Sequence, residues 1–149
     1  MATYNLADMS KWTDKAKRNG QMVMQKSVEY LVQDVRGDVG PNVGQVPVVS
    51  GNLRNSLALS TVAMPPVREG SFSDMSGTLS VAIAGLETGE TIWIGFQAAY
   101  ARRINNGFTG ADRLGRNYNQ SGKFFVQNKA DKWQSYVDQA AAEIGAETT

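Results

Sequence analysis

The sequence predicts an α+β fold, in which an antiparallel sheet of three or more strands is covered by a long N-terminal and a long C-terminal helix. Both ends of the chain show apolar residues at helical spacing, and the middle shows short runs in which apolar and polar residues alternate. At 149 residues the chain fits one domain over residues 1–149, and its hydrophobic content of 42% suffices for one modest core.

The first predicted element is a long helix over about residues 10–36. Ser10 is a suitable N-cap and Gly37 a suitable terminator. Gly20 lies in the middle of this helix, where it costs about 1 kcal/mol relative to Ala, so the position allows a kink or a close helix contact. The apolar residues that predict its buried stripe are Trp12, Ala16, Val23, Met24, Val28, Tyr30, Leu31 and Val35.

A capped helical stub and the sheet are expected over about residues 47–96. After the extended start at Pro47, Ser50 is a good N-cap, and Leu53 and Leu57 then lie four residues apart on one face of a short helix. The strands are predicted at residues 57–62, 78–83 and 91–96, with a hairpin turn at 87–90 between the last two.

A short helix over about residues 98–106, a flexible loop over 108–122 and a last helix over about 124–144 complete the predicted fold. The loop is rich in Gly, Asn and Arg, and loops of such length are usually functional or disordered. The last helix shows an uninterrupted apolar stripe that must pack on another element. The stripe consists of Val126, Ala130, Trp133, Val137, Ala141 and Ile144.

Composition excludes several classes of protein. The chain contains neither Cys nor His, so it has no Cys/His zinc site, no catalytic pair built on Cys or His, and no disulfide framework. No apolar run is long enough to span a membrane. The carboxylate pairs Asp34/Asp38 and Glu87/Glu90 are interpreted as solvated surface. We therefore expect no enzyme activity and no catalytic, cofactor-binding or metal-binding residues.

The segment Arg102–Lys132 is the main charge asymmetry of a chain whose formal net charge is only +1. Its basic residues alternate with aromatic ones, a mixture that is typical both of protein interfaces and of surfaces that bind single-stranded nucleic acid. The low net charge favours the protein interface. Trp93 would point away from the inward face of its predicted strand, toward a partner or the second helix. The interface residues that we expect are Arg54, Trp93, Arg102, Arg103, Phe108, Arg113, Arg116, Tyr118 and Lys123.

Three segments in fixed order carry a family resemblance. They are Pro47–Ser56 (PVVSGNLRNS), Tyr100–Gly107 (YARRINNG) and the aromatic start, Phe124–Val126, of the last helix. Together they resemble the tail-completion or neck proteins of tailed bacteriophages, which join head to tail and are related in role to lambda minor tail protein Z. The resemblance spans roughly residues 10–145. Asn105 departs from the family pattern, which usually has Glu there, and Gly122-Lys123 stands in place of Arg-Pro.

The resemblance implies a structural virion protein at the head–tail junction that is assembled in the host cytoplasm. It implies a homo-oligomeric ring, a hexamer or alternatively a dodecamer, with DNA passing through its channel and no contact with a membrane. One face would meet a connector or head-closure protein, and the other a tail terminator or the tail tube. A tail terminator or a head-closure subunit is an alternative of the same class. A single-strand nucleic-acid-binding protein that uses Arg102–Lys132 is the alternative of another class.

Overall fold

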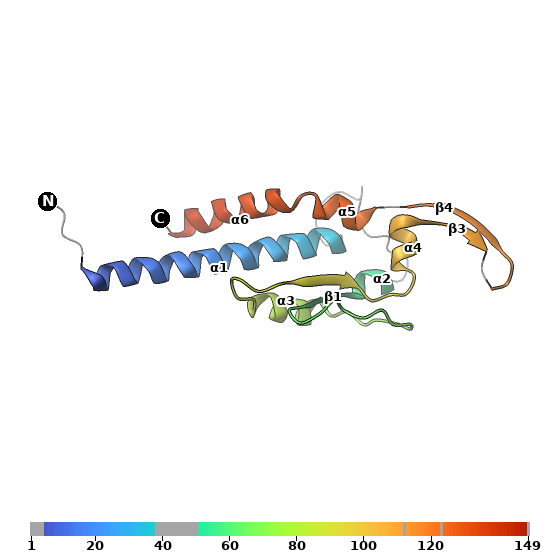
Figure 1. The fold of residues 1–149 in the computed structure, drawn as a ribbon, viewed down its shortest axis with the longest axis horizontal. Coiled ribbons are helices and arrows are strands. Elements are labelled where there is room, and N and C mark those ends of the chain that lie inside the picture. The colour runs from blue at the N-terminus through green and yellow to red at the C-terminus, as the bar shows by residue number, and fades with distance from the viewer. Residues whose placement is uncertain (1–4, 38–50, 112, 123, 149) are drawn as a thin grey trace.

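The computed structural model of the chain describes residues 5–37, 51–111, 113–122 and 124–148. The molecule is elongated (Figure 1). Helix α1 (Leu6–Arg36) occupies much of its length and lies between α6 (Trp133–Thr148) on one side and α3 (Ser76–Ala84) with a small sheet on the other. The short helices α2 (Asn52–Asn55), α4 (Ala101–Asn106) and α5 (Phe125–Ala130) gather near the C-terminal end of α1.

Helix α1 begins before the predicted cap at Ser10. The side chain of Asn5 accepts a hydrogen bond of 2.8 Å from the amide of Asp8, which satisfies one of the free N–H groups at the start of the helix. Gly37 ends α1 in the left-handed conformation, as predicted. Ser50 lies outside the described residues, and α2 is preceded by Gly51, which also has a left-handed conformation at φ +81°.

The predicted sheet of three or more strands is wrong. Among the described residues there are two separate two-stranded antiparallel sheets. Strand β1 (Leu57–Ser60) pairs with β2 (Trp93–Phe96), with Leu57 opposite Phe96. Strand β3 (Gly107–Ala111) pairs with β4 (Asn117–Ser121). Residues 91–96 thus pair with the first predicted strand and not with residues 78–83.

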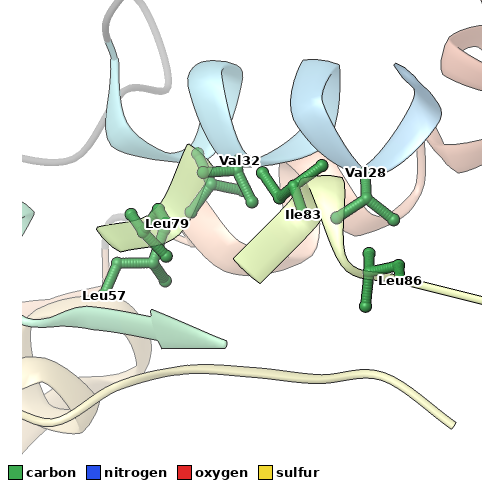
Figure 2. Close-up of a cluster of buried hydrophobic side chains, with 7 residues drawn as sticks. Val28, Val32, Leu57, Leu79, Ile83 and Leu86 are labelled. Atoms are coloured by element: carbon green, nitrogen blue, oxygen red, sulfur yellow. The ribbon is translucent and has the colours of Figure 1, made fainter. Parts of the chain in front are cut away.

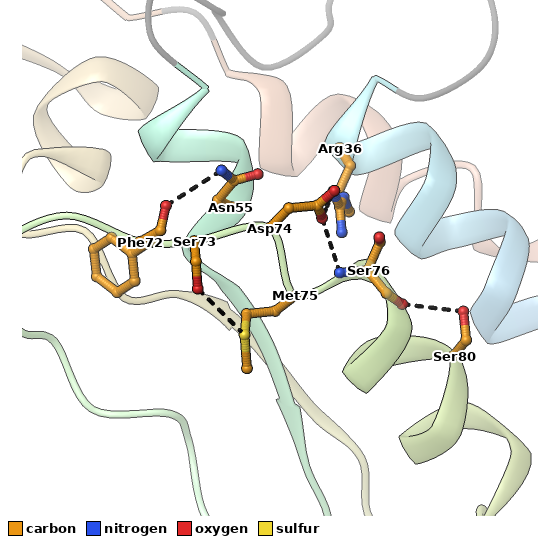
Figure 3. A network of polar contacts seen from close by, with 8 residues as sticks. All are labelled: Arg36, Asn55, Phe72, Ser73, Asp74, Met75, Ser76 and Ser80. Carbon is orange, nitrogen blue, oxygen red and sulfur yellow. Dashed lines mark hydrogen bonds and ion pairs between the residues drawn. The ribbon is translucent and has the colours of Figure 1, made fainter.

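The predicted strand at residues 78–83 is helix α3. Leu79 and Ile83 lie four residues apart and are both buried, a spacing that a helix satisfies as well as a strand does. At the start of the helix, the Asp74 carboxylate accepts a hydrogen bond of 3.0 Å from the Ser76 amide, one of the free N–H groups of the first turn (Figure 3). Hydrogen bonds from Ser76, and then from the buried Arg36, lower the pKa of Asp74.

The larger hydrophobic core joins α1, α3 and β1 (Figure 2). Leu86, directly after α3, and Val28 are each only 1% exposed. Burial of one such side chain contributes about 1.5–3 kcal/mol to folding. The buried residues of this core are Val28, Val32, Val35, Leu57, Leu79, Ile83 and Leu86.

The predicted last helix is divided into α5 and α6, which changes the buried stripe. Asp131 and Lys132 form a turn between the two helices. Val126 is 40% exposed and Trp133 39%, so neither lies in the core as predicted, whereas Ile144 does. The side chains that α5 and α6 bury are Phe125, Lys129, Tyr136, Ala140 and Ile144.

The predicted flexible loop at residues 108–122 is a β-hairpin. Both of its strands are largely exposed, so their sequence has no alternation of apolar and polar residues, and backbone pairing of Thr109 with Asn119 and its neighbours holds them together. Gly110 and Gly115 adopt positive φ angles that other residues avoid. None of the described helices is both long and apolar enough to cross a membrane.

Candidate assembly surface

The three segments that carry the family resemblance meet in a second core. Leu53 of α2, Ala101 of α4 and Phe125 of α5 are buried against one another, although they lie far apart in the sequence. The Phe125 side chain is fully buried, and its ring lies 5.3 Å from that of Phe96 in an edge-to-face arrangement. We call this cluster the motif core. Its buried members are Leu53, Phe72, Ala98, Ala101 and Phe125.

Polar side chains of α2 attach two other segments to the motif core. The Asn52 side chain accepts a hydrogen bond of 2.6 Å from the Phe72 amide, and its amide group donates to the hydroxyl of Tyr100 at 3.0 Å. Asn55 donates to the Phe72 carbonyl at 3.2 Å (Figure 3). The stub therefore fixes the segment before α3 and the start of α4 at the same time.

Asn105 joins α4 to α5. Its side-chain oxygen accepts a hydrogen bond of 3.0 Å from the Val126 amide, and its side-chain nitrogen donates to Gln127 at 2.7 Å. Asn105 thereby caps the first turn of α5, which receives no side-chain cap from Phe124. The residue is only 7% exposed. Asn at this position departs from the family pattern, and the structure gives it a role that needs both an acceptor and a donor.

The hairpin β3–β4 projects from the motif core at one end of the molecule (Figure 1). It follows α4 directly, and its return strand ends close to the start of α5. At its base, a Cβ atom added to Gly122 would lie 2.7 Å from the backbone oxygen of Asn105, so the close approach of the two segments requires glycine. The two ends of the hairpin are therefore held by packed backbone.

Three predicted interface residues meet at the base of this hairpin. The guanidinium of Arg103 lies 4.2 Å from the centre of the Phe108 ring, within the range of a cation–π contact. The Tyr118 ring lies 6.1 Å from that of Phe108 across the hairpin. Arg102, Arg113 and Arg116 are also exposed at this end. We call the set the hairpin surface; it consists of Arg102, Arg103, Phe108, Arg113, Arg116 and Tyr118.

The remaining predicted interface residues do not join the hairpin surface. Trp93 is 37% exposed at the start of β2, opposite Ser60, and β2 runs from there toward α4. Arg54 is half-buried on α2. Lys123 lies outside the described residues.

A buried polar cluster that sequence reasoning missed connects α1, α5 and α6. The ammonium of Lys129 lies 3.1 Å from the Asp34 carboxylate, and the Tyr136 hydroxyl donates a hydrogen bond to the same carboxylate. Burial, and then the contact with Asp34, raises the pKa of Tyr136. Asp34 is therefore not the solvated surface residue that we predicted, and Asp38, its expected partner, lies outside the described residues. The cluster links three helices.

An open groove of about 380 Å³ lies between α1, α3 and α6. Its carboxylates are already engaged, since Glu29 pairs with Lys26 at 3.4 Å and Glu143 accepts a hydrogen bond from Tyr30. The described residues contain no group of three or more carboxylates that could hold a metal ion.

Comparison with family models, with curated proteins and with solved structures yields no match to this chain.

Proposed function

We propose that the chain is a structural protein of a tailed-phage virion that joins the tail to the DNA-filled head. The observation that carries the proposal is the convergence of the three resembling segments in one core, through Leu53, Ala101 and Phe125. The contact of the three segments supports the proposal, because residues that maintain one core are expected to occur together. The unit supports a projecting hairpin, a form suited to contact with another chain.

In this proposal the hairpin surface binds a neighbouring subunit or the adjoining ring. Copies would form a closed ring, a hexamer or a dodecamer, with head-to-tail contacts between subunits. Arg102 and Arg103 begin the surface, and guanidinium groups pair with carboxylates through two parallel hydrogen bonds. Phe108 and Tyr118 add apolar area next to these charges, a combination typical of interface anchors.

A single-strand nucleic-acid-binding function is the second candidate, because arginines and aromatic rings occur together on the hairpin. Support for the interface comes from Arg103, which already covers one face of the Phe108 ring and leaves that face closed to a stacking base. A salt titration separates the two functions. Binding through phosphates weakens steeply as salt rises, whereas we expect no measurable binding of single-stranded DNA at physiological salt.

Deletion of the reading frame in its phage tests the proposed function. We expect DNA-filled heads and complete tails that do not join, and recovery of infectivity when purified protein is added to the mixed lysate. A variant with Arg102→Glu and Arg103→Glu should fold but fail to restore joining, because both side chains are exposed. Lys132→Glu, a charge reversal at the exposed turn before α6, is the matched control and should restore it.

Other outcomes of the deletion assign a different role. Emptied heads would indicate a head-closure subunit, and tails of abnormal length a tail terminator. Normal infectious particles would contradict any role in joining. If the double Arg variant restored infectivity as fully as Lys132→Glu, the hairpin surface would be a solvated face and its assignment wrong.

A further inference from the structure

The N-terminal part of α1 extends past the end of α6 (Figure 1). Every residue from 6 to 18 is exposed, and we call this segment the arm. In proteins most of the stability of a helix comes from packing of its apolar face on another surface and not from helix propensity. In the described residues no segment of the chain covers the arm.

The arm has a distinct apolar face. Leu6, Met9, Trp12 and Ala16 follow each other at spacings of three or four residues and share one side of the helix. Leu6 is 84% exposed, Met9 57% and Trp12 73%. Such a group of large apolar side chains on one side of an exposed helix indicates an interaction site.

This apolar face continues the side of α1 that α6 covers farther along. Met9, Ala16, Val23 and Tyr30 are seven residues apart and therefore lie on the same side of the helix. Tyr30 contacts α6 through its hydrogen bond to Glu143. The arm lies past the end of α6 of its own chain, so the side of α1 that α6 covers farther along is open there to another helix.

We propose that α6 of a second copy of this chain covers the apolar face of the arm. The outer side of α6 presents Asp138, Ala141, Ala142 and Gly145 at positions i, i+3, i+4 and i+7, and all four are exposed. Side chains as small as these let the large residues of the arm approach closely, and the space beside Gly145 is open. The proposal rests on the self-association that is part of the proposed function.

Charge favours this occupant over the hairpin surface and over a second arm. The arm contains the basic residues Lys11, Lys15, Lys17 and Arg18 against the acidic residues Asp8 and Asp14. Helix α6 contains Asp138, Glu143 and Glu147 and neither Lys nor Arg, and Asp138 belongs to its outer side. The hairpin surface is basic, as is a second arm, so both would repel the arm, whereas α6 attracts it.

The small size of the arm predicts how copies associate. Three large side chains bury less than the roughly 800 Å² per partner of a standard interface, so one arm does not hold a stable dimer. In a ring, each copy gives one arm and receives another, and closure adds these weak contacts together. We therefore expect assembly that depends steeply on protein concentration.

Disulfide trapping tests the pairing, because the natural chain contains no Cys. One variant carries Met9→Cys and the other Ala142→Cys, and the two purified proteins are mixed and mildly oxidised. We expect a disulfide-linked dimer in the mixture, and a ladder of linked copies from a chain that carries both substitutions. Arg113→Cys, on the hairpin, replaces Ala142→Cys in the matched control and should give no linked dimer with Met9→Cys.

A second variant separates assembly from folding. Trp12→Glu should keep the helical content and thermal stability of the free chain, because the Trp12 side chain is 73% exposed, but should raise the concentration at half-assembly at least tenfold. Lys11→Ala, on the opposite side of the arm, is its control and should change this concentration by less than about twofold, because it removes one of several charges and no apolar contact.

Three results overturn the inference: linkage of Met9→Cys to itself, linkage to the hairpin at Arg113→Cys, or no linkage to α6. None of these results decides whether the protein joins heads to tails, because the deletion experiment measures that function independently. A disulfide between Met9→Cys and Ala142→Cys, together with normal particles from the deletion phage, would support the inference and contradict the proposed function.

Discussion

The two halves of α1 differ in their surroundings although they belong to one continuous helix. The half that contains Val28, Val32 and Val35 is covered by α3 and the small sheet on one side and by α6 on the other. The arm at residues 6–18 has an equally clear apolar face and is exposed throughout. The period of apolar residues thus predicts which side of a helix becomes covered, but not whether the same chain covers it.

Paired aromatic substitutions sharpen this comparison and give the largest expected effect. Phe125→Ala should lower the free energy of unfolding by about 3–5 kcal/mol, because it removes a fully buried ring from the motif core. Trp12→Ala should change it by less than about 0.5 kcal/mol, since this side chain is 73% exposed. Chemical denaturation at a concentration where the protein is monomeric measures both.

Equal losses from the two variants would break the comparison. A large loss for Trp12→Ala would mean that the arm packs on its own chain in solution. A small loss for Phe125→Ala would mean that the motif core does not hold the hairpin, and would remove the structural support of the proposed function.

Sequence reasoning found the helical ends of the fold and failed in the middle. Residues 78–83 satisfy both the helical and the strand pattern. Leu79 and Ile83 are four residues apart, which places them on one face of a helix and also on one face of a strand. In the structure Leu79 and Ile83 pack as a helical face in the same core as α1, a long-range contact that the sequence does not show. The hairpin was missed because its exposed strands have no apolar alternation.

The same limits apply to the candidate site. Local composition predicts Arg103, Phe108 and Tyr118 as interface residues. The structure brings them together, because Phe108 and Tyr118 lie on the two strands of one hairpin and Arg103 lies on the helix directly before it. The interpretation of Asp34 as solvated surface is wrong. A charged residue is normally solvated, and the distant partner of Asp34, Lys129, cannot be read from the sequence. A division of the last helix at Asp131 and Lys132 then moved the buried stripe away from the predicted positions.

Removal of the Tyr136 hydroxyl tests the covered half of α1 at high pH. Tyr136→Phe should cost about 1.5 kcal/mol at neutral pH, the lower end for a hydrogen bond to a charged group, because Asp34 keeps its contact with Lys129. The raised pKa means that the folded chain keeps this proton when the unfolded chain loses it. Its contribution is therefore complete below the ordinary value of 10.0 and declines as pH rises above it.

Denaturation of both proteins over a series of pH values measures this effect. The difference in unfolding free energy between the natural chain and Tyr136→Phe should be constant at neutral pH and shrink above pH 10.0. A difference that stays constant into the alkaline range would show that the hydroxyl is not held against Asp34 in solution.

Gly20 lies at the boundary between the arm and the covered half of α1. Its substitution has the smallest expected effect on stability. A Cβ atom added there would meet nothing within 4 Å, so the close helix contact that its sequence position allowed is absent. Gly20→Ala should therefore stabilise the chain by about 1 kcal/mol through helix propensity alone and raise the melting temperature by about 2–4 °C. Assembly should stay unchanged or improve, because the arm keeps its direction. A loss of stability, or assembly that fails while the monomer is more stable, would show that the arm must bend at this glycine to reach the neighbouring copy.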